Sequence, residues 1–89
     1  MNGRVSIPWR VEKYQLTRTS DGDQTISRDV AINGWKAIAV AGFYSFIHVS
    51  AGINTVNLYV DIDQQKVYWD CFSAVAGSGI YVFILYVPD

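Results

Sequence analysis

The final segment of the chain, residues 80–87, is apolar at every position. A β-strand points successive side chains to opposite faces of its sheet, so a strand with one solvated face alternates apolar and polar residues. Residues 80–87 do not alternate, which predicts a strand that is covered on both sides. One cover is the core of its own domain. Because the chain has only 89 residues, we expect the other cover to be a further copy of the same chain.

The rest of the sequence also favours strands, because short apolar runs and alternations are separated by Gly, Asn, Asp and Ser. The predicted strands are residues 9–19, 24–32, 36–43, 55–63, 66–72 and 80–87. Residues 44–54 are irregular, and we expect them to form a short strand or arm followed by a loop. This spacing is typical of an all-β fold. We predict a small antiparallel β-sandwich, jelly-roll-like, with about six or seven strands. Residues 1–8 form a lead-in, and residues 9–89 form a single domain.

Local patterns assign turns and faces within this scheme. The pair Asn33 and Gly34 is a strong signal for a tight hairpin, and Gln64 and Gln65 turn a second one. In residues 36–43, one side carries Ile38 and Val40, and the other carries Ala37, Ala39 and Ala41. In residues 55–63, the positions predicted to face inward are Val56, Leu58, Val60 and Ile62. The positions predicted to face outward there are Thr55, Asn57, Tyr59, Asp61 and Asp63.

Composition supports assembly and argues against several partners. Hydrophobic residues make up 51% of the chain and aromatic residues 15%, whereas a small domain buries only about 60% of its unfolded surface. The net charge is −1 and the basic residues are scattered, so we do not expect nucleic-acid binding, which needs clustered Lys and Arg. The longest apolar run is far shorter than the roughly 20 residues of a membrane helix. We expect no membrane insertion and no signal peptide.

Few residues offer reactive or metal-binding chemistry. Cys71 is the single cysteine, so no intrachain disulfide forms, and we expect it to be a small core hydrophobe. His48 is the single histidine and has no partner for a zinc site. The carboxylate pairs within residues 21–23 and 61–63 are too few for calcium, which takes six to eight oxygen ligands. We therefore predict no metal, no cofactor and no catalytic residues.

Aromatic residues beside polar ones are the best candidates for ligand binding. Sugars are bound by aromatic faces with a few polar groups that fix orientation. The residues that satisfy this description are Trp35, Tyr44, His48, Asn57, Tyr59 and Tyr68. The alternative is that these side chains are buried between subunits, where Tyr and Trp are enriched. We expect Trp69, which alternates with Val67 and Cys71, to be buried in the core.

Residues 33–43 resemble a strand that recurs in phage tail proteins, and residues 83–87 resemble the closing strand of those proteins. Residues 56–60 and 67–69 also fall where that pattern has strands. The chain is similar, over about residues 10–88, to the C-terminal head domains of tail-fibre or minor structural proteins from phages of Gram-positive and gut bacteria. It departs from the pattern at Trp35, where Tyr is usual, and at Ala39, where Gly is common.

The resemblance implies an all-β, trimeric, non-enzymatic tip domain of an extracellular virion fibre, which binds a bacterial surface glycan or protein. The apolar strand implies an oligomer interface near the three-fold axis, and we assign to it Ile80, Val82, Phe83, Ile84 and Tyr86. Two alternatives stay open. The domain is a structural trimerisation or capping module without a ligand, or it is a glycan hydrolase with a site between subunits, for which Asp61 and Asp70 are candidate carboxylates.

Overall fold

Six β-strands follow one another in the computed structural model, which describes residues 8–19, 22–46, 54–74 and 77–89. The strands are β1 (Arg10–Thr17), β2 (Gly22–Asp29), β3 (Trp35–Phe46), β4 (Asn54–Asp61), β5 (Lys66–Ala74) and β6 (Gly79–Pro88). This part of the chain contains no helix of the length and apolarity that crossing a membrane requires. The all-β prediction is confirmed.

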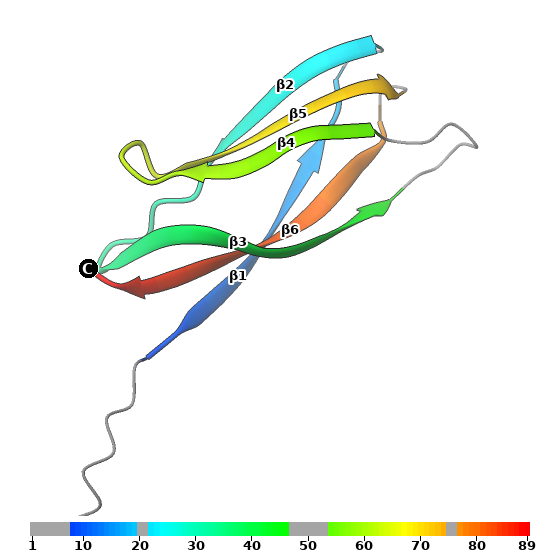
Figure 1. Cartoon of the computed structure of the whole chain (residues 1–89). Coiled ribbons are helices and arrows are strands. Elements are labelled where there is room, and N and C mark those ends of the chain that lie inside the picture. The colour runs from blue at the N-terminus through cyan, green and yellow to red at the C-terminus, as the bar shows by residue number, and fades with distance from the viewer. Residues whose placement is uncertain (1–7, 20–21, 47–53, 75–76) are drawn as a thin grey trace, which may run out of the picture.

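The strands form two antiparallel sheets of three strands each, in the orders β1-β6-β3 and β2-β5-β4. The sheets lie in two layers, with the apolar core between them (Figure 1). Among these strands, β4 and β5 form a hairpin, as the Gln64–Gln65 turn predicts, and Gln65 takes a positive φ of 54° there. Every other connection carries the chain from one sheet to the other.

The predicted hairpin at Asn33 and Gly34 is wrong, although the turn itself forms. Gly34 has a φ of 84°, and the Trp35 amide donates to the Ile32 carbonyl at 3.0 Å. The flanking strands β2 and β3 nevertheless belong to different sheets. A tight turn reverses the chain locally, but pairing is decided by packing. Here β2 pairs with β5, and β3 pairs with β6.

Two bulges in β3 break the predicted alternation of residues 36–43. The register against β6 shifts between Ala37 and Ala39 and again between Val40 and Gly42. A bulge inserts an extra residue and moves the following side chains to the other face. Ala37, before the first bulge, is fully buried opposite Tyr86, and because of that bulge Val40 faces the same core opposite Ile84. The predicted continuous alanine face does not form.

The two central strands supply most of the core. The buried side chains of β5 and β6 are Val67, Trp69, Cys71, Ile80, Val82, Ile84 and Tyr86. Trp69 is fully buried, and Leu58 and Val60 pack on the core from β4, as predicted. The inward assignment of Ile62 is wrong, because β4 ends at Asp61 and Ile62 lies in the following turn with 42% of its surface exposed. The side chain of Val56 lies outside the described residues.

The two sides of β6 have different environments. Ile80, Val82, Ile84 and Tyr86 are buried in the core of their own chain, at 0 or 1% exposure. Their assignment to an oligomer interface is therefore wrong, because the opposite sheet of the same chain already covers them. Phe83, the fifth residue of that assignment, lies on the other side of β6 and is half-buried between the outward side chains of β1 and β3.

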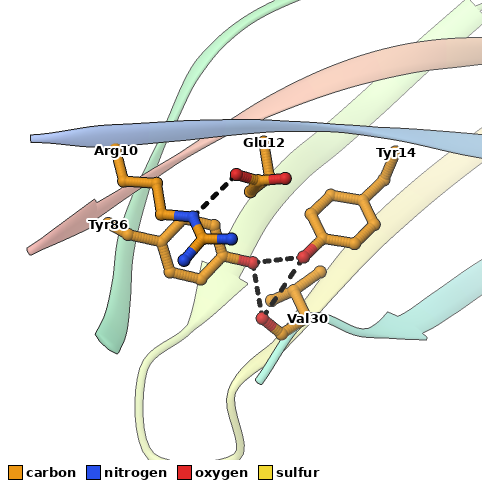
Figure 2. Close-up of polar contacts among 5 residues, drawn as sticks. All are labelled: Arg10, Glu12, Tyr14, Val30 and Tyr86. Atoms are coloured by element: carbon orange, nitrogen blue, oxygen red, sulfur yellow. Dashed lines mark hydrogen bonds and ion pairs between the residues drawn. The ribbon is translucent and has the colours of Figure 1, made fainter. Parts of the chain in front are cut away.

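A polar cluster ties the two layers together near the start of β1 (Figure 2). The Tyr86 hydroxyl donates to the carbonyl of Val30 at 2.5 Å, and it lies 2.5 Å from the Tyr14 hydroxyl. Beside them, the Arg10 Nε donates to the Glu12 carboxylate at 2.7 Å. Burial, followed by the Tyr14 hydrogen bond, raises the pKa of Tyr86 well above its usual range. This phenol therefore stays protonated and holds the Val30 carbonyl.

Candidate functional site

The outward side of the β2-β5-β4 sheet brings together three of the residues predicted to bind a ligand. In the register of β4 against β5, Tyr59 lies opposite Tyr68, and Asn57 lies opposite Asp70. On the other side of β5, Thr25 lies opposite Asp70. Strand alternation predicts this sharing of a face, and the structure confirms it. We call this surface the tyrosine face, and its residues are Thr25, Ser27, Asp29, Asn57, Tyr59, Asp61, Lys66, Tyr68 and Asp70.

The two tyrosine rings of this face stack across the strands. Their centroids are 5.4 Å apart with an interplanar angle of 19°, and Tyr59 is 48% exposed. On its other side, Tyr68 has Ser27 as its cross-strand neighbour. Serine is too small to cover a phenol ring. The two rings therefore offer an apolar surface on the solvent side of the sheet, beside the small side chain of Ser27.

Asp70 gives this surface a charged group with a fixed orientation. Thr25 Oγ1 donates to one carboxylate oxygen at 2.6 Å, and Asn57 Nδ2 donates to the other at 3.1 Å. These hydrogen bonds, that from Thr25 first, lower the pKa of Asp70. The Tyr68 hydroxyl donates to Gln64 Oε1 at 2.6 Å. Each carboxylate oxygen retains a further lone pair for an outside donor.

The other predicted ligand residues lie elsewhere. Trp35 begins β3 at one end of the sandwich, where the Arg10 guanidinium lies 5.4 Å from its ring centroid. Tyr44 lies on the outward side of the opposite sheet, and His48 falls outside the described residues. The structure therefore does not form one site from all six predictions.

The outward side of the β1-β6-β3 sheet is aromatic and basic. We call it the apolar face, and its large or charged residues are Val11, Lys13, Lys36, Tyr44, Phe46, Tyr81, Phe83, Leu85 and Val87. The Tyr81 ring lies 5.1 Å from Tyr44 and 5.0 Å from Phe46, and the Lys13 Nζ lies 4.3 Å from the Tyr81 centroid. Hydrogen bonding to Tyr44 raises the pKa of Lys13. The register places no carboxylate on this side of the described strands.

Cys71 lies in a setting that the sequence did not predict. The thiol is buried, as expected, but the guanidinium of Arg18, which is only 1% exposed, reaches it from the end of β1. Arg18 Nη1 donates to Sγ at 2.6 Å, and Nη2 donates to the carbonyl of Gly22. Burial is the main cause that raises the pKa of the Cys71 thiol, which is opposite to the shift that activates a nucleophilic cysteine.

Gln65 and Arg18 are structural residues that the sequence reading missed. Both use long polar side chains to join segments that are far apart in sequence: Gln65 bonds the backbone of Ala37, and Arg18 contacts Cys71. The sequence pattern identifies Gln65 only as a turn residue, and nothing in the local pattern indicates that Arg18 is buried. Across the described ranges, no group of three or more His, Cys, Asp or Glu side chains is placed to hold a metal ion.

Comparisons of the chain with protein-family models, with curated proteins and with solved structures found no match.

Proposed function

We propose that this chain is a non-enzymatic binding module that takes a glycan on its tyrosine face. The observation that carries the proposal is the stacked pair of Tyr59 and Tyr68 beside the oriented carboxylate of Asp70. An aromatic ring packs on the C–H side of a sugar, and a few fixed polar groups select its hydroxyls. Asp70 accepts from a sugar hydroxyl, and the pair of rings supplies the apolar contact.

In this proposal the module forms an oligomer, and its copies contact one another through the apolar face. Large apolar side chains on that surface include Phe83 and Tyr44, which is 46% exposed. Exposed apolar patches of this kind mark interaction surfaces. In the finer form of the proposal, the sandwich is jelly-roll-like, and three copies form the tip of a phage tail fibre, as the sequence resemblance implies. Three weak glycan sites on one rigid body raise avidity without new contacts.

The test of the glycan site compares two double variants on a glycan array and on bacterial surface polysaccharides. We expect Tyr59→Ala with Tyr68→Ala to lose binding by about tenfold or more, because each aromatic contact contributes about 0.5–1.5 kcal/mol. The matched control is Tyr59→Phe with Tyr68→Phe, which keeps both rings and the Asp70 hydrogen bonds and should retain ring-dependent binding. Equal binding by the wild type and the tyrosine variant would exclude this face as the site.

A structural module without a ligand is the second candidate, and one observation favours it. Polar groups of the tyrosine face already have partners within the chain, since Asp70 accepts from Thr25 and Asn57, and Tyr68 donates to the neighbouring Gln64. A purely structural surface would be satisfied in the same way. This candidate predicts that the oligomer forms normally and that no glycan or host cell retains it.

A further inference from the structure

The free edge of β1 differs from the other three edges of the two sheets. The edge strands are β1 and β3 in one sheet and β2 and β4 in the other. The register against the central strand shifts once in β2, once in β4 and twice in β3, whereas β1 pairs with β6 without a shift. Bulges protect a sheet edge from pairing with another chain. β1 lacks this protection, and its first half lies apart from β2 (Figure 1).

The backbone of β1 presents the amides and carbonyls of Val11 and Lys13 to this edge. The Arg18 amide donates to the Ser78 carbonyl, and the Arg18 carbonyl accepts from the Gly77 amide, so the backbone of Arg18 faces the β6 side. Successive residues of a paired strand face its two sides alternately. With an unshifted register, Val11 and Lys13 therefore face away from β6. Within the described part of the chain, no group bonds these outward amides and carbonyls.

Two long side chains decide which part of this edge is open. Arg28 of β2 donates from Nη1 to the Gln15 carbonyl at 2.9 Å, so it covers the second half of the edge. A lysine on an edge strand usually guards that edge. The Lys13 Nζ, however, lies 4.3 Å from the ring centroid of Tyr81 on β6, so its ammonium is drawn over the sheet and away from the edge. The open part of the edge is therefore residues 9–13.

We propose that this open edge pairs with the same edge of a second copy of the chain, antiparallel and centred on Val11. A pairing centred on Arg10, Glu12 or Lys13 would place like charges directly opposite each other, which is destabilising. A pairing centred on Val11 places Arg10 opposite Glu12 of the second copy, twice by symmetry. It also brings together exposed apolar side chains, because Val11 is 49% exposed and Trp9 is 60% exposed.

This contact is separate from the contact through the apolar face. Two identical edges that pair are related by a two-fold axis, whereas three copies at the tip of a fibre are related by a three-fold axis. The edge pairing would join the β1-β6-β3 sheets of two copies into one continuous sheet. Either contact can therefore be present while the other is absent.

The first experiment is disulfide cross-linking of the full chain, measured by mass under non-reducing conditions. In the proposed register, Val11 lies opposite itself with Cα atoms about 5.5 Å apart, which suits a disulfide. Val11→Cys should cross-link at least about tenfold faster than Lys13→Cys, the matched control on the same edge that does not lie opposite itself. The native Cys71 is buried and is present in both variants. The same preference should persist when Phe83→Asp is added to both.

The second experiment tests the backbone pairing with Val11→Pro. This change removes an amide that the β1–β6 ladder does not use, so the fold should stay intact. Association at millimolar concentration, measured from dilution-dependent shifts of the Lys13 amide, should weaken about tenfold or more. Val11→Thr keeps the amide and should leave this association within about twofold of the wild type.

Three results would overturn the edge contact. They are equal cross-linking of Val11→Cys and Lys13→Cys, unchanged association of a folded Val11→Pro variant, and loss of the Val11→Cys preference when Phe83→Asp is added. If Val11→Pro does not fold, the cross-linking comparison decides. A wild-type mass that is unchanged by Phe83→Asp, with the Val11→Cys preference retained, would overturn only the contact through the apolar face.

Discussion

The two outward surfaces of this sandwich are built on the same plan and have opposite chemistry. Each is the solvent side of a three-stranded antiparallel sheet, with an edge strand on each side of a central one. Outward positions of central strand β6 are Tyr81, Phe83, Leu85 and Val87, and those of central strand β5 include Lys66, Tyr68 and Asp70. On the inward side, Val67, Trp69 and Cys71 of β5 and Ile80, Val82, Ile84 and Tyr86 of β6 are all buried. The difference between the two surfaces therefore lies in the outward side chains.

This difference distinguishes the side chains that the fold of one chain requires from those that it does not require. A sandwich of two small sheets needs apolar side chains only at its inward positions, as in β5, where Val67, Trp69 and Cys71 are buried. The apolar outward side of β6 adds nothing to that core. It leaves Phe83 and its neighbours half-buried beside the exposed Val11 and Tyr44. We propose that these outward apolar residues of β6 serve contact with further copies of the chain, because the fold of one chain does not require them.

The largest expected effect comes from placing a charge on the apolar face. Phe83→Asp should dissociate the proposed oligomer, weakening association by about 100-fold or more, because central aromatic contacts contribute 2 kcal/mol or more and a buried unpaired carboxylate adds to the loss. Sedimentation equilibrium measures the mass. Tyr59→Asp makes the same kind of change on the tyrosine face and should leave the mass unaltered. A wild-type chain that is monomeric at micromolar concentration would refute assembly through this surface.

The next largest effect is expected at the polar cluster between the two sheets, because its hydrogen bonds hold both sheets together. Tyr86→Phe removes the hydroxyl that donates to the Val30 carbonyl. This change should lower the free energy of unfolding by about 1–3 kcal/mol, because it leaves a buried acceptor poorly satisfied. Urea unfolding provides the measurement. The control is Tyr81→Phe on the outward side of the same strand, where the same substitution should cost about 0.5 kcal/mol or less. Equal losses in the two variants would show that the cluster of Tyr14, Val30 and Tyr86 is not structural.

A pH series tests the same buried phenol. The folded-state pKa of Tyr86 is raised above its ordinary value of 10.0, with burial as the first cause. The neutral phenol therefore contributes stability that is fully present below pH 10 and is lost as the pH rises above that value. Unfolding free energies between about pH 8 and 11 should fall less steeply in Tyr86→Phe than in the wild type. The Cys71 pKa is also raised, but this thiol is present in both proteins, so its contribution cancels in the comparison.

The sequence carries much of the fold because strand alternation is a local property. Period two places Tyr59 with Asn57 and Tyr68 with Asp70, and the structure keeps both pairs on one face. The same rule gives no direction in residues 80–87, where every position is apolar. Phe83 and Val82 are equally suited to the core by type, and only the packing of the opposite sheet buries Val82 and leaves Phe83 outside.

Features that join distant segments could not be predicted. The turn at Asn33 and Gly34 is visible in the sequence, but the choice of β5 and β6 as partners for the strands around it depends on the whole core. A pocket beside Trp35 is lined by Ile62, Asp63, Gln65 and Asp89, which only the folded chain brings to the same end of the sandwich. Bulges in β3 add a further limit, because nothing in residues 36–43 marks where the alternation changes side.

The smallest expected effect concerns Asp70, and it sharpens the contrast between the faces. Hydrogen bonds from Thr25 and Asn57 lower its pKa below the ordinary value of 3.8, so the carboxylate contributes stability that is present above pH 3.8 and is lost as the pH falls through the lowered pKa. In an acid titration followed by NMR, the Tyr59 and Tyr68 ring signals should therefore shift below that value, and those of Tyr81 should not. Asp70→Asn should abolish the shift and leave the fold intact. If the Tyr81 ring moved in step with Tyr59 and Tyr68, the acid transition would be global, and the tyrosine face would not respond as a local unit.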